Sequence, residues 1–107
     1  MGSGSDKYLK LIKKIVLENI PKDKFLVFLF GSRTLNKHRF GADVDIGIKG
    51  NKELNQDIIY KIKEKIEESI VPFKVDIIDF SKVDESFKTE AFKNVEIWNQ
   101  ANSINLD

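Results

Sequence analysis

The stretch "FGSRTLNKHRFGADVDIGI", Phe30 to Ile48, connects two apolar segments and decides the fold. A Gly-Ser pair stands where the first segment, "FLVFLF" (Phe25 to Phe30), stops, and the second segment, "DVDIGI" (residues 43–48), carries Asp43 and Asp45. On a strand, residues two apart project from the same face, so both carboxylates would share one face and the intervening apolar side chains the other. Because buried carboxylates are costly, the pair points to a functional role.

The rest of the chain alternates predicted helices with predicted strands. In the middle of the chain, Ile58, Ile62, Ile66 and Ile70 recur every four residues, which predicts a helix that Pro72 terminates. "FLVFLF" is short, continuous and apolar, which is typical of a central strand buried on both faces. Helices are expected at Asp6–Asn19, Asn51–Ser69 and Val83–Lys93, and strands at Phe25–Phe30, Asp43–Ile48, Phe73–Phe80 and Val95–Trp98.

Two helix starts are also predicted from capping residues. Asp6 fits the N-cap of the first helix, and Ser32 can cap a short helical turn running to about Lys37.

The order of elements predicts an α+β domain of layered α/β type, a small mixed sheet with helices packed on it. The link from Gly31 to Ala42 is near the lower limit for a parallel crossover, so parallel and antiparallel pairings of its flanking strands both stay open.

The chain of 107 residues fits a single domain, expected at residues 6–100. Residues 1–5, "MGSGS", resemble a cloning scar or disordered leader, and residues 101–107 resemble a frayed tail. The longest apolar run has six residues, far short of the ~20 that span a bilayer. With a formal net charge of +1, bulk electrostatics favour neither nucleic acid nor membrane binding.

The numbers of cysteine and histidine residues restrict the kinds of catalytic site and metal site that the chain can form. The absence of cysteine excludes disulfides, thiolate catalysis and cysteine-based zinc sites, and it fits a reducing cytoplasm. The single histidine, His38, makes a Ser-His-Asp triad or a multi-histidine metal site improbable, and it fits a solvated loop position. Any metal site would then use oxygen ligands, which suit a hard cation such as Mg²⁺ or Mn²⁺.

A third carboxylate can join the first two. In "KVDIIDF", Asp76 faces away from Val75 and Ile77, and it would lie beside Asp43 and Asp45 if the two strands are neighbours. Three carboxylates on one face repel one another, and one or two divalent cations would supply the countercharge. Each aspartate alone, and Asp79 as well, also fits a solvated position on a strand.

The residues of the Gly-Ser turn are of the kind that bind a phosphate group. Gly31 offers close backbone approach, Ser32 a hydroxyl donor at a predicted helix N-terminus, and Arg33 a charged fork for phosphate oxygens. Taken alone, Gly-Ser at a strand-to-helix junction is ordinary capping. Together with the carboxylates, it predicts a site for a metal-bound nucleoside triphosphate.

These motifs resemble a known superfamily. "GSR", nine residues of linker, "DVD" and the later aspartate in "KVDIID" are similar to the nucleotidyltransferases related to DNA polymerase beta, over about Phe25 to Phe80. Within the superfamily, the chain resembles the minimal nucleotidyltransferases. The resemblance implies a polymerase beta-like core that uses Mg²⁺ and ATP or another nucleoside triphosphate. It also implies a HEPN-domain partner in a toxin–antitoxin pair, whose tyrosine receives AMP from ATP.

The resemblance assigns roles by motif position. Two departures stand in the linker, where Leu35-Asn36 and Ala42 replace a small residue followed by glycine and a serine in many relatives. Asn36 tolerates left-handed backbone angles, so the turn can be kept. The implied triphosphate-binding residues are Gly31, Ser32 and Arg33, and the implied catalytic metal ligands are Asp43, Asp45 and Asp76, with Asp76 also helping to activate the acceptor hydroxyl.

Three functions stay open. The first is transfer of AMP to a partner protein, favoured because the chain shows no second domain to hold an acceptor. The second is a non-catalytic, nucleotide-binding subunit that neutralises a HEPN partner through apolar surface near Phe87, Phe92 and Trp98. The third is transfer to a small molecule, disfavoured by the short chain. Nucleotide preference, acceptor, number of metals and oligomer formation are left open.

Overall fold

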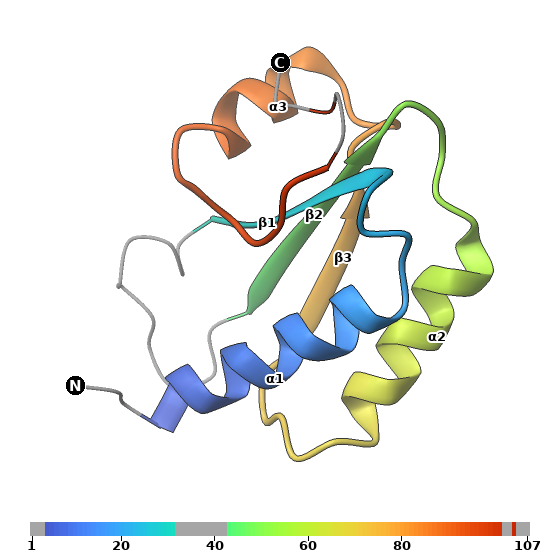
Figure 1. Ribbon diagram of the computed structural model, residues 1–107. Helices are drawn as coiled ribbons and strands as arrows, with labels where there is room; N and C mark the ends of the chain where they lie inside the picture. The colour runs from blue at the N-terminus through green and yellow to red at the C-terminus, as the bar shows by residue number, and fades with distance from the viewer. Residues whose placement is uncertain (1–3, 32–42, 102–103, 105–107) are drawn as a thin grey trace.

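A computed structural model describes residues 4–31, 43–101 and 104, and it has the expected α+β architecture (Figure 1). In these residues, three helices pack on one four-stranded mixed sheet. The elements are α1 (Gly4–Glu18), β1 (Phe25–Phe30), β2 (Val44–Gly50), α2 (Gln56–Glu67), β3 (Val75–Asp79), α3 (Glu85–Ala91) and β4 (Val95–Ile97). No helix in this part of the chain is long and apolar enough to cross a membrane.

The sheet has the strand order β3-β2-β1-β4. β1 pairs antiparallel with both β2 and β4, which settles the relation that the sequence left open. β2 and β3 pair in parallel, and the segment between them, which contains α2, provides the crossover that a parallel pair requires. β1 is therefore an interior strand, and all six of its residues are buried, as expected.

One face of the sheet is covered by α1 and α2, which lie together on that side in Figure 1. Ile12 and Val16 of α1 and Ile62 of α2 are fully buried against alternate residues of the strands. Apolar side chains at helical spacing meet apolar side chains at strand spacing, so burial of both sets stabilises the layer. The strand residues in this core are Phe25, Val27, Leu29, Val44, Ile46, Ile48 and Ile77.

The opposite face carries α3 and an aromatic cluster, defined here as Phe28, Phe30, Phe80, Phe87 and Phe92. Phe28 and Phe80 lie with their ring centroids 4.9 Å apart in an edge-to-face arrangement. Aromatic pairs prefer this geometry because the positive ring edge meets the negative ring face. α3 lies over this face of the sheet (Figure 1), and its Ala91 belongs to the same buried core as Phe28, Phe30 and Phe80.

Several helix boundaries differ from the predicted ones. α1 begins at Gly4, so Asp6 lies within its first turn rather than at the N-cap, and two residues of the expected leader are helical. α2 begins at Gln56 because Asn55 caps it, its side chain accepting a hydrogen bond from the Asp57 N–H. Helix ends move readily by one or two residues, but the α2 start moved by five. The predicted turn from Ser32 to Lys37 lies outside the described residues.

The isoleucine spacing that predicts α2 does not continue the helix as far as Ile70. α2 ends at Glu67, and Ile70 is 70% exposed. The Ser69 hydroxyl donates to the Ile66 carbonyl, which satisfies an acceptor at the helix end. Four residues, 68–71, separate the end of α2 from Pro72.

The solvated position expected for Asp79 is also wrong. This carboxylate is 7% exposed and lies at the end of β3. One oxygen accepts from the Leu54 N–H at 3.0 Å, and the other accepts from the Ser81 N–H and hydroxyl. The hydrogen bonds hold the β2–α2 loop against the end of β3, so Asp79 has a structural role.

Asp79→Ala is therefore expected to lower the free energy of unfolding by roughly 2–4 kcal/mol, because it leaves the Leu54 and Ser81 N–H groups without their acceptor. Urea unfolding measures the change. Ser81→Ala, which removes only one of the donors, should cost about 1 kcal/mol. Equal losses in the two variants would contradict the assigned role of Asp79.

Candidate functional site

Two of the three predicted carboxylates lie side by side on neighbouring strands. Asp45 of β2 and Asp76 of β3 are register partners, and Phe30 at the end of β1 is the partner of Asp45 on its other side. Their strand neighbours Val44, Ile46 and Ile77 pack under α1 and α2, so Asp45 and Asp76 project to the face of the aromatic cluster. The condition that the two strands be neighbours is thus confirmed.

Asp43 directly precedes β2 and is exposed. The predicted strand began at this residue, whereas β2 begins at Val44, whose N–H donates to the Lys74 carbonyl. Asp43 nevertheless acts on Asp45 electrostatically, as does Asp76. The three carboxylates therefore form one electrostatic group at the end of the sheet where β1 ends and where β2 and β3 begin.

The charge state of Asp45 reflects this environment. Its pKa is raised above the ordinary value, first by burial of the carboxyl, then by the Asp76 charge and then by the Asp43 charge. Each cause makes the ionised form less favourable. A positive charge bound beside Asp45 would relieve all three effects at once.

Gly31 brings the end of β1 against Asp45. Its φ of +86° lies in the left-handed region, where residues with a side chain are strained. A Cβ at this position would lie 2.9 Å from Asp45 Oδ2, too close for an ordinary contact. The absence of a side chain at Gly31 therefore lets the end of β1 lie directly against the Asp45 carboxylate. Ser32 and Arg33, the other predicted phosphate ligands, lie outside the described residues.

The carboxylate oxygens of this group are ligands of the kind that a hard cation prefers, but they do not surround a cation on all sides. Among the described residues, no three acidic, histidine or cysteine side chains come close enough together to form a ready-made metal site. Mg²⁺ is commonly held by one or two carboxylates together with phosphate oxygens of a substrate, and it needs no full cage of protein ligands. Asp45 and its neighbouring carboxylates agree with such a shared site.

A cavity of about 390 Å³ reaches Asp76 but is not lined by Asp43 or Asp45. Asp76 is part of its wall, together with the end of α2 and the loop that leads into β3. Both charged and apolar side chains line it. The lining residues are Lys63, Ile66, Glu67, Val71, Pro72, Phe73, Lys74, Val75 and Asp76.

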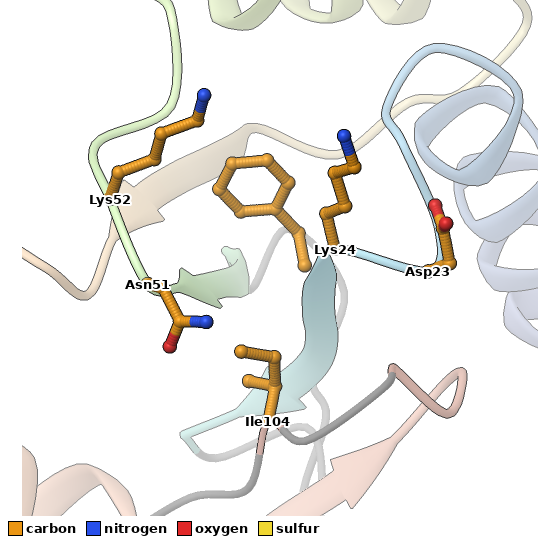
Figure 2. Close-up of a pocket in the computed structure, with 6 residues that line it drawn as sticks. Asp23, Lys24, Asn51, Lys52 and Ile104 are labelled. Carbon is orange, nitrogen blue, oxygen red and sulfur yellow. The ribbon is translucent and has the colours of Figure 1, made fainter.

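A larger cavity, about 500 Å³, lies at the opposite end of β1. Figure 2 shows Asp23, Lys24, Asn51, Lys52 and Ile104 around it, with both lysine side chains extending away from Ile104. Phe25 also lines it and pairs with Gly50, whereas Asp45 pairs with Phe30 five residues further along the strand. At ~3.4 Å per residue, roughly 17 Å separate this cavity from the carboxylates. Although this cavity is the larger of the two, it lies too far from the carboxylates to belong to the same site.

The raised pKa of Asp45 predicts how stability changes with pH. The folded protein holds the Asp45 proton more tightly than the unfolded chain does, whose pKa stays near the ordinary 3.8. The stabilisation from this proton is complete below the unfolded-state pKa and is lost as pH rises through the folded-state pKa. We therefore expect the free energy of unfolding of the ligand-free protein, relative to Asp45→Asn, to fall from acid to neutral pH.

Urea unfolding of both proteins in a series of buffers measures this difference. Taking the difference removes most of the contribution of the other carboxyl groups, although Asp43 and Asp76 are coupled to Asp45. A difference that stays flat, or that rises with pH, would show that burial and like charges do not act on Asp45 as described.

Comparison with known proteins agrees with this geometry. The family model described as polymerase beta, nucleotidyltransferase, matches residues 10–103. The probable protein adenylyltransferase MntA of Haemophilus influenzae is 30% identical over 80 residues, which cover 75% of this chain and 68% of that protein.

Solved structures share the fold. A toxin–antitoxin structure with AMP-PNP superposes with a TM-score of 0.69 at 22% identity, covering 89% of this chain and 74% of that one. The complex of a tri-AMPylated Shewanella oneidensis HEPN toxin with an MNT antitoxin has a TM-score of 0.65 at 21% identity, covering 89% and 71%. The resemblance to minimal nucleotidyltransferases is confirmed. The chain therefore belongs to the polymerase beta family of nucleotidyltransferases.

Proposed function

We propose that this nucleotidyltransferase transfers AMP from ATP to a hydroxyl of a partner protein, in a reaction that depends on Mg²⁺. The partner is a HEPN-domain toxin, and the chain acts as its antitoxin in the cytoplasm. The observation that carries the proposal is the approach of Gly31 to the Asp45 carboxylate, with Asp76 directly beside it. A relative described as a protein adenylyltransferase and structures of toxin–antitoxin complexes support the choice of acceptor.

The triphosphate would lie at the end of β1. Gly31 lies against Asp45 and has no side chain to obstruct an approaching phosphate, and Ser32 and Arg33 follow it in the chain and would add a hydroxyl and a guanidinium. Asp43 and Asp45 would hold Mg²⁺, and Asp76 would complete the group. When bound there, the cation would neutralise charge that develops on the phosphates and offset the repulsion among the three carboxylates.

The acceptor would approach Asp76. Asp76 lines a cavity beside the end of α2, from which a hydroxyl-bearing side chain would reach this residue. The acceptor oxygen forms a bond to the α-phosphorus, and the bond from that phosphorus to the bridging oxygen breaks. Pyrophosphate leaves, and the acceptor proton passes to the Asp76 carboxylate, which acts as general base.

The proposal is tested by incubating the purified protein with ATP, Mg²⁺ and a HEPN-domain protein encoded beside it. The mass of the partner protein is then measured by mass spectrometry. A mass gain of one or more AMP groups is expected, and it should disappear when Mg²⁺ is removed with a chelator. No gain under conditions in which ATP binds would refute transfer to this partner.

The variant Asp43→Ala tests whether the toxin is neutralised by catalysis or by binding alone. Asp43 is exposed and lies outside the strands, so its removal should leave the fold and the complex intact. If neutralisation of the toxin is lost in this variant while the complex still forms, catalysis is required. Persistent neutralisation would favour the non-catalytic alternative.

A further inference from the structure

We infer that Phe87 is the platform on which the nucleotide base stacks, an assignment that rests on the proposed function. The triphosphate site fixes one end of the nucleotide at Gly31 and Asp45. The base must then lie within one nucleotide length of that point, on the face to which Asp45 projects. An exposed aromatic ring on that face is the feature to find, because base–aromatic stacking tolerates any base and needs a free ring surface.

Phe87 meets this description. Among the described residues, the exposed large hydrophobic side chains are Tyr60, Ile70, Phe87 and Ile97. Tyr60 lies on α2, which covers the other face, and Ile70 follows that helix. Ile97 pairs with Phe28 and shares the carboxylate face, but it is aliphatic. Phe87, at 42% exposure, is thus the exposed aromatic residue of this set on the carboxylate face.

The aromatic cluster connects Phe87 directly to the site. Its ring centroid lies 6.0 Å from that of Phe30 in an edge-to-face arrangement. Phe30 is the residue before Gly31 and the register partner of Asp45. One buried ring, that of Phe30, therefore separates Phe87 from Gly31 and Asp45, which places Phe87 beside the proposed nucleotide site rather than elsewhere on the surface.

The surrounding structure also holds Phe87 in place. Its ring packs on Phe80, with centroids 5.7 Å apart, and both Phe30 and Phe80 are almost fully buried. Its backbone N–H donates to the Asp84 side chain at 2.8 Å, which caps α3. A ring that is already ordered loses little side-chain entropy when a base stacks on its exposed part.

The cavity beside Asp76 offers a competing position for the base. Phe73 lines that cavity, but its ring already lies edge-to-face with Tyr8, with centroids 5.7 Å apart. Phe73 also packs against the core beneath α1 and α2, whereas Phe87 belongs to the face that carries Asp45. The observations therefore favour Phe87 for the base and leave the cavity to the acceptor.

The test compares two probes, ATP and inorganic tripolyphosphate, each titrated with Mg²⁺ against the full-length protein by calorimetry. Phe87→Leu keeps apolar packing on Phe30 and Phe80 but removes the aromatic ring. It should weaken ATP binding about tenfold and leave tripolyphosphate binding unchanged. Phe87→Trp should keep the wild-type ATP affinity. Ile97→Ala, an exposed apolar residue on the same face, and Phe73→Leu should change neither affinity.

Each other outcome overturns the assignment. An equal loss for both probes would show a structural effect, and unchanged ATP binding would show that Phe87 does not contact the base. A loss confined to Phe73→Leu would place the base in the cavity. Weakened binding of the HEPN partner with unchanged ATP affinity would make Phe87 part of a protein interface. If the wild type binds ATP no better than tripolyphosphate, only the assignment of Phe87 fails. If it binds neither probe, the proposed function fails as well.

Discussion

Asp45→Asn is expected to reduce AMP transfer at least about a thousandfold while the protein stays folded. Asp45 is the carboxylate next to Gly31, and it interacts with both Asp43 and Asp76. Asparagine keeps the size of the side chain but removes the negative charge that the proposed cation needs. The rate of mass gain of the partner protein, at saturating ATP, measures the loss.

Stability gives an independent check on this variant. Because burial and like charges raise the Asp45 pKa, the ionised side chain is unfavourable in the ligand-free protein at neutral pH. The variant should therefore be at least as stable as the wild type while it is inactive, a trade-off typical of functional sites. Asp57→Asn, in the first turn of α2, is the matched control and should keep full activity. An active Asp45→Asn protein would rule out the proposed cation site.

Gly31→Ala is expected to have the second largest effect, on activity and stability together. The methyl group would meet Asp45 Oδ2 at 2.9 Å and would sit on a backbone with φ of +86°. The backbone strain should cost about 1–2 kcal/mol of unfolding free energy. Displacement of the Asp45 carboxylate should slow transfer about a hundredfold or more. Urea unfolding and the partner-mass assay measure the two effects.

Gly50→Ala provides the control for destabilisation alone. Gly50 lies at the far end of β2, and a Cβ there would come within 2.4 Å of the Phe25 ring. This clash should also cost about 1–3 kcal/mol. Because the clash is remote from Asp45, activity per folded molecule should be unchanged. If the two variants lose activity equally, the effect of Gly31→Ala comes from stability and not from the site.

Much of the fold could be predicted because its signals are local. The continuous run Phe25–Phe30 predicts a strand buried on both faces, and every residue of β1 is buried. Alternation at Val44, Ile46 and Ile48 predicts one apolar face, and all three are fully buried. The predictions failed at α2, where the start and the end depend on hydrogen bonds of Asn55 and Ser69 that periodicity does not reveal.

The roles of the aspartates could be predicted only in part. The sequence predicts that the D-x-D pair on one strand and the aspartate on the next strand share one face of the sheet. The strand register confirms that Asp45 and Asp76 are neighbours. Asp79 stands three residues after Asp76 and looks equivalent in the sequence, yet it is buried and structural. The difference arises because residues an odd number apart on a strand face opposite sides, and Asp79 meets the β2–α2 loop there.

The sequence by itself determined the alternation of helices and strands, the apolar faces and the motif positions of Gly31, Asp43, Asp45 and Asp76. These features depend on residues close together in the chain, where periodicity and capping are sufficient. Only the tertiary structure decided the antiparallel pairing of β1 with β2, the approach of Gly31 to Asp45 and the contact of Phe87 with Phe30. Those contacts join residues that are distant in the chain, and they form only when the register and packing of the whole sheet bring them together.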